Sequence, residues 1–306
     1  MTRLRRLRPG DRIALVAPAS PFESADVEAG AQELARLGFE AVYDQTLFSR
    51  ETFVAGSVET RTAAIHRAWK DPSIAALIAM RGGYGSAQLL PRLDPALMLA
   101  ARKPLVGYSD ITALLGFYLQ HGLPAVHGPM IDRRLAAGPS RYDEASFLRV
   151  LTMAEPAGEM RPAGLETLHA GEADGTLAGG TLTQMCCLLG TPWAQLVPEH
   201  AVLFLEDVNE RPYRVHRMLT HLAQAGVLAR AGALVFGEFP GCDEPGGRPA
   251  IRDVLREFTA EFRGPVLFGF PSGHTAGAMW TLPLGVGAHV VGDAQPAVII
   301  TEAAVG

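Results

Sequence analysis

The stretch KPLVGYSDITALLGFYLQHG (residues 103–122) contains the pattern on which the fold prediction rests. A short apolar run, KPLVG, is followed after Tyr108 by the polar pair Ser109–Asp110 and then by apolar residues at helical spacing. This order predicts a strand that turns sharply into a helix. The polar pair has two interpretations: a helix N-cap formed by Ser109 or Asp110, or a serine held at the start of a helix as a nucleophile.

The same alternation of apolar runs and helical patterns extends along the first half of the chain. Runs that are apolar throughout predict strands, and the segments between them have apolar residues at the spacing of a helix. Strands of this kind are buried on both faces, so the pattern predicts a doubly wound α/β domain with a parallel sheet. The predicted strands lie at 12–20, 74–80, 103–107 and 124–128, and the helices at 26–39, 58–71, 86–94 and 110–122.

The second half predicts a mixed domain. Strands at 201–207, 233–239 and 265–274 alternate with helical patterns, and two runs interrupted by glycine and proline, 280–292 and 296–301, predict an antiparallel closing sheet. Residues 138–172 are rich in Pro, Gly and charged residues, which is typical of a domain connection. We therefore predict an N-terminal domain over 1–137 that carries the nucleophile, a linker over 138–172, and a C-terminal domain over 173–306.

Composition excludes several classes of protein. The net charge is only -5 and the charges are scattered, so there is no basic footprint for a nucleic acid. No run approaches the roughly 20 apolar residues of a membrane span, and the basic N-terminal segment is followed by an apolar run that Pro18 interrupts, which is wrong for a secretory signal. The 3 cysteines make no even-numbered disulfide framework. We expect a cytoplasmic protein without a nucleic-acid or membrane partner.

Candidate chemical groups follow the predicted strands, at the edge where ligands of α/β sheets gather. The loop RGGYG after strand 74–80 contains Gly82 and Gly83, whose backbone N–H groups could meet an anion or oxyanion. Glu206 and Asp207 end an apolar strand, where a carboxylate is either a surface turn residue or the group that orients an imidazole. The candidate serine and the candidate acids thus each lie at the end of a predicted strand.

Histidine supplies the candidate base. His274 lies in the loop PSGHT after the apolar run PVLFGF (265–270), where a flexible segment could bring the imidazole to a nucleophile. His127, at the end of the strand 124–128, is its main competitor, and either ring could instead be structural. Together with Ser109 and Glu206, His274 completes the order serine, acid, base along the chain, which predicts a serine hydrolase.

Several segments in this order resemble the LD-carboxypeptidase family, whose members are cytoplasmic serine peptidases that trim murein tetrapeptides. The resemblance covers nearly the whole chain. The segments are RGGYGSAQLLPRLD (81–94), LVGYSDITALL (105–115), HGPM (127–130), GGTLTQMCCLLGTPW (179–193), LEDVNERPYRVHRML (205–219) and GFPSGHT (269–275).

The resemblance implies roles for particular residues. It places the nucleophile at Ser109, the acid at Glu206 and the base at His274. It also implies a flavodoxin-like N-terminal domain, a swivelling C-terminal domain and a homodimer, with a murein tetrapeptide as substrate.

Further site residues follow from the proposed chemistry. The oxyanion would accept hydrogen bonds from the N–H of Asp110 and from that of Gly82 or Gly83. Arg81 could bind the terminal carboxylate of the substrate or form a structural ion pair. Tyr84, in the same loop, belongs to the candidate substrate-binding group. No cofactor or metal is expected, because no H-E-x-x-H motif is present.

Other interpretations remain open. His216 occupies a position where relatives often carry an acidic residue, so a salt bridge there is in doubt. The loop RGGYG favours murein recycling over the related branch that destroys the antibiotic microcin. A zinc carboxypeptidase lacks a ligand set, since His216 and His221 point to different helix faces, and an amidotransferase-like hydrolase would carry cysteine in place of Ser109. A non-catalytic muropeptide-binding module would keep the cleft without the triad.

Overall fold

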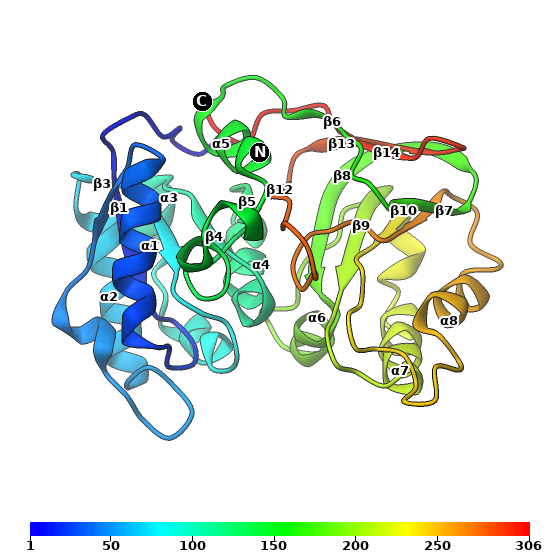
Figure 1. The fold of residues 1–306 in the computed structure, drawn as a ribbon, viewed down its shortest axis with the longest axis horizontal. Coiled ribbons are helices and arrows are strands. Elements are labelled where there is room, and N and C mark those ends of the chain that lie inside the picture. The colour runs from blue at the N-terminus through cyan, green and yellow to red at the C-terminus, as the bar shows by residue number, and fades with distance from the viewer.

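Two α/β halves lie side by side in the computed structural model, which describes residues 1–306 (Figure 1). The first half contains five parallel strands in the spatial order β2-β1-β3-β4-β5, which is the flavodoxin-like order. The doubly wound parallel sheet predicted from the sequence is therefore confirmed. The strands are β1 (Arg12–Val16), β2 (Glu40–Val42), β3 (Ile74–Ala79), β4 (Leu105–Gly107) and β5 (Ala125–His127).

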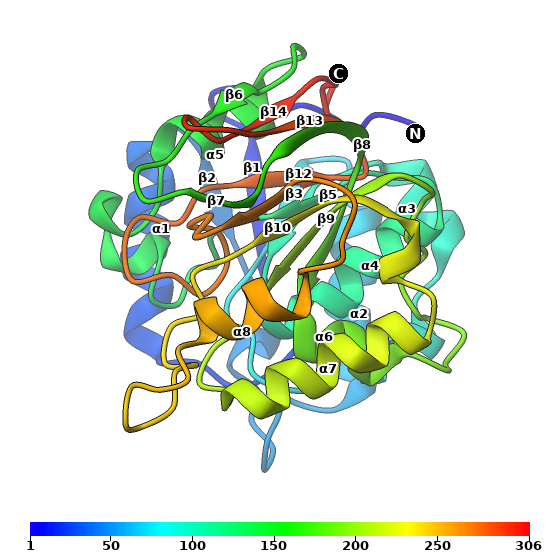
Figure 2. The ribbon, with the colours of Figure 1, turned by 90° about the vertical axis from the view of Figure 1, so that its right-hand side faces the viewer.

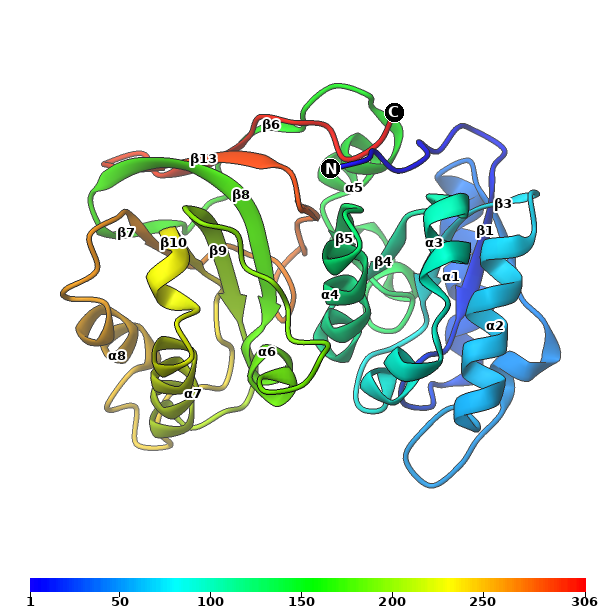
Figure 3. The ribbon, with the colours of Figure 1, turned by 180° about the vertical axis from the view of Figure 1, so that it is seen from behind.

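Helices cover both faces of this sheet, because its central strands are apolar on both sides. Helix α1 lies on one face, and α2, α3 and α4 lie on the other (Figures 1 and 3). The predicted helix at 86–94 is a short 3-10 helix that precedes α3. The helices are α1 (Ser24–Arg36), α2 (Val58–Lys70), α3 (Pro95–Ala101) and α4 (Thr112–Gln120), and the 3-10 helices are η1 (Gln45–Phe48), η2 (Ser86–Arg92), η3 (Ser109–Ile111), η4 (Leu135–Ala137), η5 (Pro139–Arg141) and η6 (Leu228–Arg230).

A mixed sheet of 8 strands forms the second half, in the order β6-β14-β13-β8-β9-β10-β11-β7 (Figure 2). Strands β8 to β11 are parallel neighbours, whereas the strands at both edges pair antiparallel. The mixed second domain is thus confirmed. Its elements are β6 (Gly158–Met160), β7 (Glu166–His169), β8 (Gly171–Thr181), α6 (Leu182–Leu188), β9 (Ala201–Glu206), α7 (Pro212–Gln224), β10 (Ala231–Phe236), α8 (Ile251–Phe258), β11 (Val266–Phe268), β13 (Gly287–Gly292) and β14 (Ala297–Ile300).

The chain crosses between the halves more often than a simple linker requires. Residues 138–172 contain α5 (Glu144–Thr152) and both edge strands, β6 and β7, of the second sheet. The run 280–292 divides into β12 (Leu282–Leu284), which pairs antiparallel with β5 of the first sheet, and β13, which pairs with β14 as expected. The boundaries at 137 and 173 stay a prediction, since each half takes strands from the other side of them.

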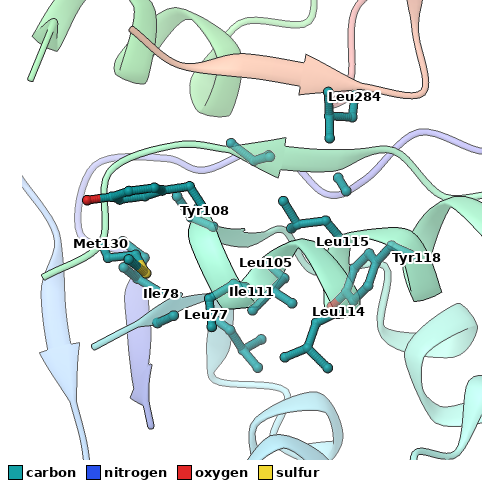
Figure 4. Packing of buried hydrophobic residues seen from close by; sticks show 14 of the residues in the cluster. Leu77, Ile78, Leu105, Tyr108, Ile111, Leu114, Leu115, Tyr118, Met130 and Leu284 are labelled. Carbon is teal, nitrogen blue, oxygen red and sulfur yellow. The ribbon is translucent and has the colours of Figure 1, made fainter. Parts of the chain in front are cut away.

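Both termini meet at the junction of the halves, where Leu4 and Val305 form a parallel bridge. Helix α4 is nearly completely buried there, because it packs against β5 on one side and α6 of the second half on the other. Leu284 of β12 faces the cluster that contains Leu115 and Tyr118 (Figure 4). All cysteines are free, and no helix is long and apolar enough to cross a membrane.

Because the Leu284 side chain packs into the core at the junction of the halves, Leu284→Ala should destabilise the protein. Leu284 is 0% exposed, and removing a buried leucine side chain costs about 2–5 kcal/mol. We expect a clear fall in the urea midpoint followed by circular dichroism. The control is Leu99→Ala on α3, whose side chain is 42% exposed. Equal midpoints for the two variants would contradict the role given to β12.

Candidate active site

The turn after β4 holds Ser109 in a strained conformation. Ser109 has φ +60°, which a residue with a side chain adopts at a cost on the order of 1–3 kcal/mol. It begins η3, which leads directly into α4. The N-cap residues of η3 and α4 are Tyr108 and Ile111, and neither helix has a side-chain cap. The N-cap interpretation is therefore wrong, and the turn matches a strand-to-helix turn that presents a serine.

The glycine loop after β3 packs directly against Ser109. A Cβ atom at Gly82 would lie 2.8 Å from Ser109 Cβ and 3.0 Å from its Oγ, so only glycine allows this approach. The side chain of Asp110 accepts a hydrogen bond from the backbone N–H of Ser86 (2.7 Å), and the Ser86 hydroxyl donates to the Asp110 carbonyl (2.5 Å). Burial raises the pKa of Asp110, and the hydrogen bonds from Ser86 oppose this rise. Gly82, Ser109 and Asp110 thus come together as expected.

Ser20, which follows β1, fixes the far side of the same loop. Its hydroxyl accepts a hydrogen bond from the N–H of Tyr84 (3.0 Å) and donates to the carbonyl of Phe53 (3.0 Å). Gly83 has φ +97°, and a Cβ there would lie 2.5 Å from Ser20 Oγ. Tyr84 remains 55% exposed at the rim. Ser20 is not among the site residues predicted from the sequence, although it follows β1 as the other candidates follow their strands.

At the end of β9, Glu206 is 0% exposed and holds His274. Its Oε2 accepts hydrogen bonds from the backbone N–H and from Nδ1 of His274, both 2.8 Å, and its Oε1 accepts from the Thr181 hydroxyl. A Cβ at Gly273 would lie 2.4 Å from Glu206 Cδ, so glycine is required beside the carboxyl. Burial alone would raise the pKa of Glu206, but His274 and Thr181 lower it to about 2. The group is an ionised carboxylate that fixes the imidazole.

His274 lies next to the serine turn. Its ring meets the ring of Tyr108, the residue before Ser109, edge to face at 5.1 Å between centroids. Burial lowers the pKa of His274, but Glu206 outweighs burial and the net pKa is raised. With Nδ1 bonded to Glu206, the other nitrogen, Nε2, is the one available to a nucleophile. A hydrogen bond from Ser109 Oγ to Nε2 is not formed here; such bonds are often long until substrate binds.

The competing groups lie in other environments. His127 is fully buried, neither ring nitrogen has a partner, and burial lowers its pKa to about 4. Asp207 accepts hydrogen bonds from the backbone and the hydroxyl of Thr183, and burial raises its pKa to about 6. Neither residue forms the carboxylate–imidazole pair. The geometry therefore favours Glu206 and His274 over their neighbours.

Arg81 and His216 form no hydrogen bond or ion pair with Glu206 or His274. Arg81 donates to the carbonyl of Pro21 (2.9 Å), and its guanidinium lies 3.4 Å from the carboxylate of Asp132. Arg81 thus forms a structural ion pair, which was the alternative to a role in substrate binding. His216 lies exposed on α7 with its ring against Phe258 and takes part in no ion pair. The salt bridge that was in doubt at this position is absent.

Two protein-family models match this chain: the LD-carboxypeptidase N-terminal domain over residues 13–128 and the LD-carboxypeptidase C-terminal domain over 174–290. A murein tetrapeptide carboxypeptidase of Pseudomonas aeruginosa is 34% identical over 271 residues, which cover 87% of this chain and 88% of the relative. The chain belongs to the LD-carboxypeptidase family. The resemblance inferred from the motifs is therefore confirmed.

Solved structures of the LD-carboxypeptidase family have the same two-domain fold. A muramoyltetrapeptide carboxypeptidase from Oxalobacter formigenes is 31% identical, with a TM-score of 0.84 over 95% of this chain and 99% of that one. The microcin C7 self-immunity protein MccF, in complex with aspartyl sulfamoyl adenosine, is 26% identical, with a TM-score of 0.92 over 100% of both chains. Membership of this family makes the protein a peptidase.

Gly82→Ala tests the close approach of the glycine loop to the serine turn. The added methyl group would collide with Ser109, so we expect peptidase activity to fall by at least about tenfold, with little change in the thermal midpoint. Gly246→Ala is the matched control, because a Cβ at Gly246 meets no atom within 4 Å. Wild-type activity in Gly82→Ala would show that the loop does not constrain Ser109.

Proposed function

We propose that the protein is a serine carboxypeptidase that removes the terminal D-alanine of murein tetrapeptides through Ser109, His274 and Glu206. The observation that carries the proposal is the buried Glu206–His274 pair, joined at 2.8 Å and packed against the strained turn that presents Ser109. A carboxylate-oriented imidazole beside a partly exposed serine is the arrangement of nucleophilic acyl transfer.

In the proposed reaction, His274 Nε2 takes the proton of Ser109 Oγ as Oγ bonds to the carbonyl carbon that precedes D-alanine. The carbonyl π electrons move to the oxygen and form a tetrahedral oxyanion. His274 then gives its proton to the leaving amine, the C–N bond breaks, and D-alanine departs. Water, activated by the same imidazole, hydrolyses the acyl-enzyme and restores Ser109. Glu206 stays ionised and stabilises the imidazolium.

Backbone N–H groups would stabilise the oxyanion. The contact between Gly82 and Ser109 brings the amides of the glycine loop beside that of Asp110. We assign the oxyanion hole to the N–H of Asp110 and that of Gly82 or Gly83, a type of donor worth about 3–4 kcal/mol each. These donors need no reorganisation, because Ser86 and Ser20 fix the loop on both sides.

The names of the relatives support the murein substrate, since those from Pseudomonas aeruginosa and Oxalobacter formigenes are carboxypeptidases of murein tetrapeptides. We further propose that Arg81, half-exposed beside the glycine loop, meets the terminal carboxylate and that Tyr84 lines the peptide path. A cytoplasmic homodimer without a cofactor completes the proposal.

A second candidate is hydrolysis of a peptide-nucleotide of the microcin type. The observation that favours it is the TM-score of 0.92 to the self-immunity protein. The RGGYG loop favours the murein substrate instead. Incubation with each substrate, followed by mass spectrometry, distinguishes the two: release of D-alanine alone supports the first candidate, and cleavage of only the aminoacyl sulfamoyl nucleotide supports the second.

Ser109→Ala and His274→Ala should each abolish D-alanine release while the fold is retained, and Glu206→Gln should leave a small residual rate. The three groups act as one unit, so the double variant Ser109→Ala/His274→Ala should be no slower than either single one. His216→Ala, exposed on α7, is the control and should keep the wild-type rate. Near-wild-type turnover in Ser109→Ala would exclude this nucleophile.

The free carboxylate of the substrate provides a separate test. We expect L-Ala-D-Glu-meso-diaminopimelate-D-Ala to lose only its last residue, and the carboxamide-capped and all-L peptides to react at least about tenfold more slowly, a loss of about 1.4 kcal/mol in transition-state stabilisation. Capping removes the charge that Arg81 and the loop amides would bind. Rates are compared at equal concentration, well below saturation. Equal rates for free and capped peptides would remove the carboxylate-sensing role.

A further inference from the structure

Arg134 lies at the centre of the loop that carries the candidate base. Its guanidinium is buried, with 4% of the residue exposed. Nη2 donates on both sides of His274, and Nη1 donates further along the same loop and to a neighbouring turn. The acceptors are the carbonyl oxygens of Gly273 (3.1 Å), Thr275 (2.8 Å), Gly277 (3.0 Å) and Arg141 (3.1 Å).

The backbone before Arg134 is fixed to the first sheet. Ile131 N–H donates to the carbonyl of Ala79 (3.2 Å), and Asp132 N–H donates to that of Met80 (2.8 Å). These acceptors are the last residue of β3 and the first residue after it, so they directly precede the glycine loop. Arg134 therefore connects the loop that carries His274 to the end of β3. The glycine loop that follows β3 packs against Ser109.

No carboxylate partners Arg134 within salt-bridge distance, and its Nε is buried without a hydrogen-bond acceptor. The charge faces carbonyl oxygens and the ring of Tyr108, whose centroid is 5.9 Å from Arg134 Cζ. The same ring meets His274 edge to face. Burying an unpaired cation is costly, so a guanidinium kept here calls for a function beyond packing.

We propose that Arg134 is a positioning residue of the catalytic reaction: its guanidinium sets the alignment of His274 with Ser109 and places a positive charge beside the loop that carries the imidazole. This inference rests on the proposed function, because it concerns the same base. Arg134 does not touch the reacting atoms and acts only through the loop that it holds.

The sign of the charge effect follows from the groups that face the imidazole. Glu206 and Asp207 raise the pKa of His274, and burial and Arg134 lower it. Removing the cation should raise that pKa further, so the neutral base would require a higher pH. The acid limb of the kcat/KM profile should then move to higher pH. The remaining facing groups are Tyr108, whose pKa is raised by burial, and His127, whose pKa is lowered to about 4 by burial.

Two substitutions separate alignment from charge. Arg134→Lys keeps the cation but cannot donate to all these carbonyls, so kcat should fall by at least about tenfold with the acid limb unchanged. Arg134→Met loses the positive charge and the hydrogen-bond donors, so kcat should fall and the acid limb should move to higher pH. KM should stay within about threefold in each. Arg133→Met is the control, because that guanidinium is exposed and lies 3.6 Å from Asp132; it should match the wild type.

An NMR titration of the His274 Cε1–H signal, assigned with His274→Asn, tests the charge effect without substrate. A higher pKa in Arg134→Met than in the wild-type protein supports the proposal, and an unchanged pKa overturns it. Wild-type kcat in Arg134→Lys overturns the alignment role, even if Arg134→Met does not fold. A wild-type protein that releases no D-alanine refutes the proposed function instead, and the titration still decides the role of Arg134.

Discussion

The site depends on one constraint: the ionised carboxylate of Glu206 is completely buried and must be surrounded by hydrogen-bond donors. A buried charge is tolerated only when hydrogen-bond donors surround it. Here the donors come from separate parts of the chain: Thr181 at the end of β8, and the backbone and imidazole of His274 after β11. The parallel pairing of β8 with β9 places Thr181 opposite Glu206 in register. The carboxyl edge of the second sheet therefore fixes the His274 imidazole through Glu206.

The loop that bears this imidazole belongs to neither half alone. It leaves β11 of the second sheet and returns through β12 to the edge of the first, where β12 pairs with β5. Met279 in this loop also exchanges backbone hydrogen bonds with Arg141 and Asp143. The position of His274 relative to Ser109 is thus fixed from both sheets at once, rather than by a single interdomain surface.

Much of this arrangement could be predicted from the sequence, because strand ends are local signals. Ser109, Glu206 and His274 each lie at the end of an apolar run, and the rule that ligands gather at carboxyl ends of strands marks each of them as a candidate. Their meeting could not be predicted from that rule, because Ser109 follows a strand of the first sheet and the other two belong to the second. The contacts of Arg134 could not be predicted in this way, since its partners in the His274 loop lie 139–143 residues further along the chain. Strand β12 is only Leu-Pro-Leu, and its proline argues against a strand unless an edge position is known.

The pairing of β5 with β12 also affects how the protein is made. Unpaired strand edges invite association with other chains, and β5 is the edge of the parallel sheet until β12 covers it. The paired residues of β12 lie 155–159 positions further along the chain. At a synthesis rate of about 5–20 residues per second, the nascent first half carries an open strand edge for roughly 8–30 s. A first sheet that forms during this interval would therefore present the backbone N–H and C=O groups of β5 to other chains until β12 emerges.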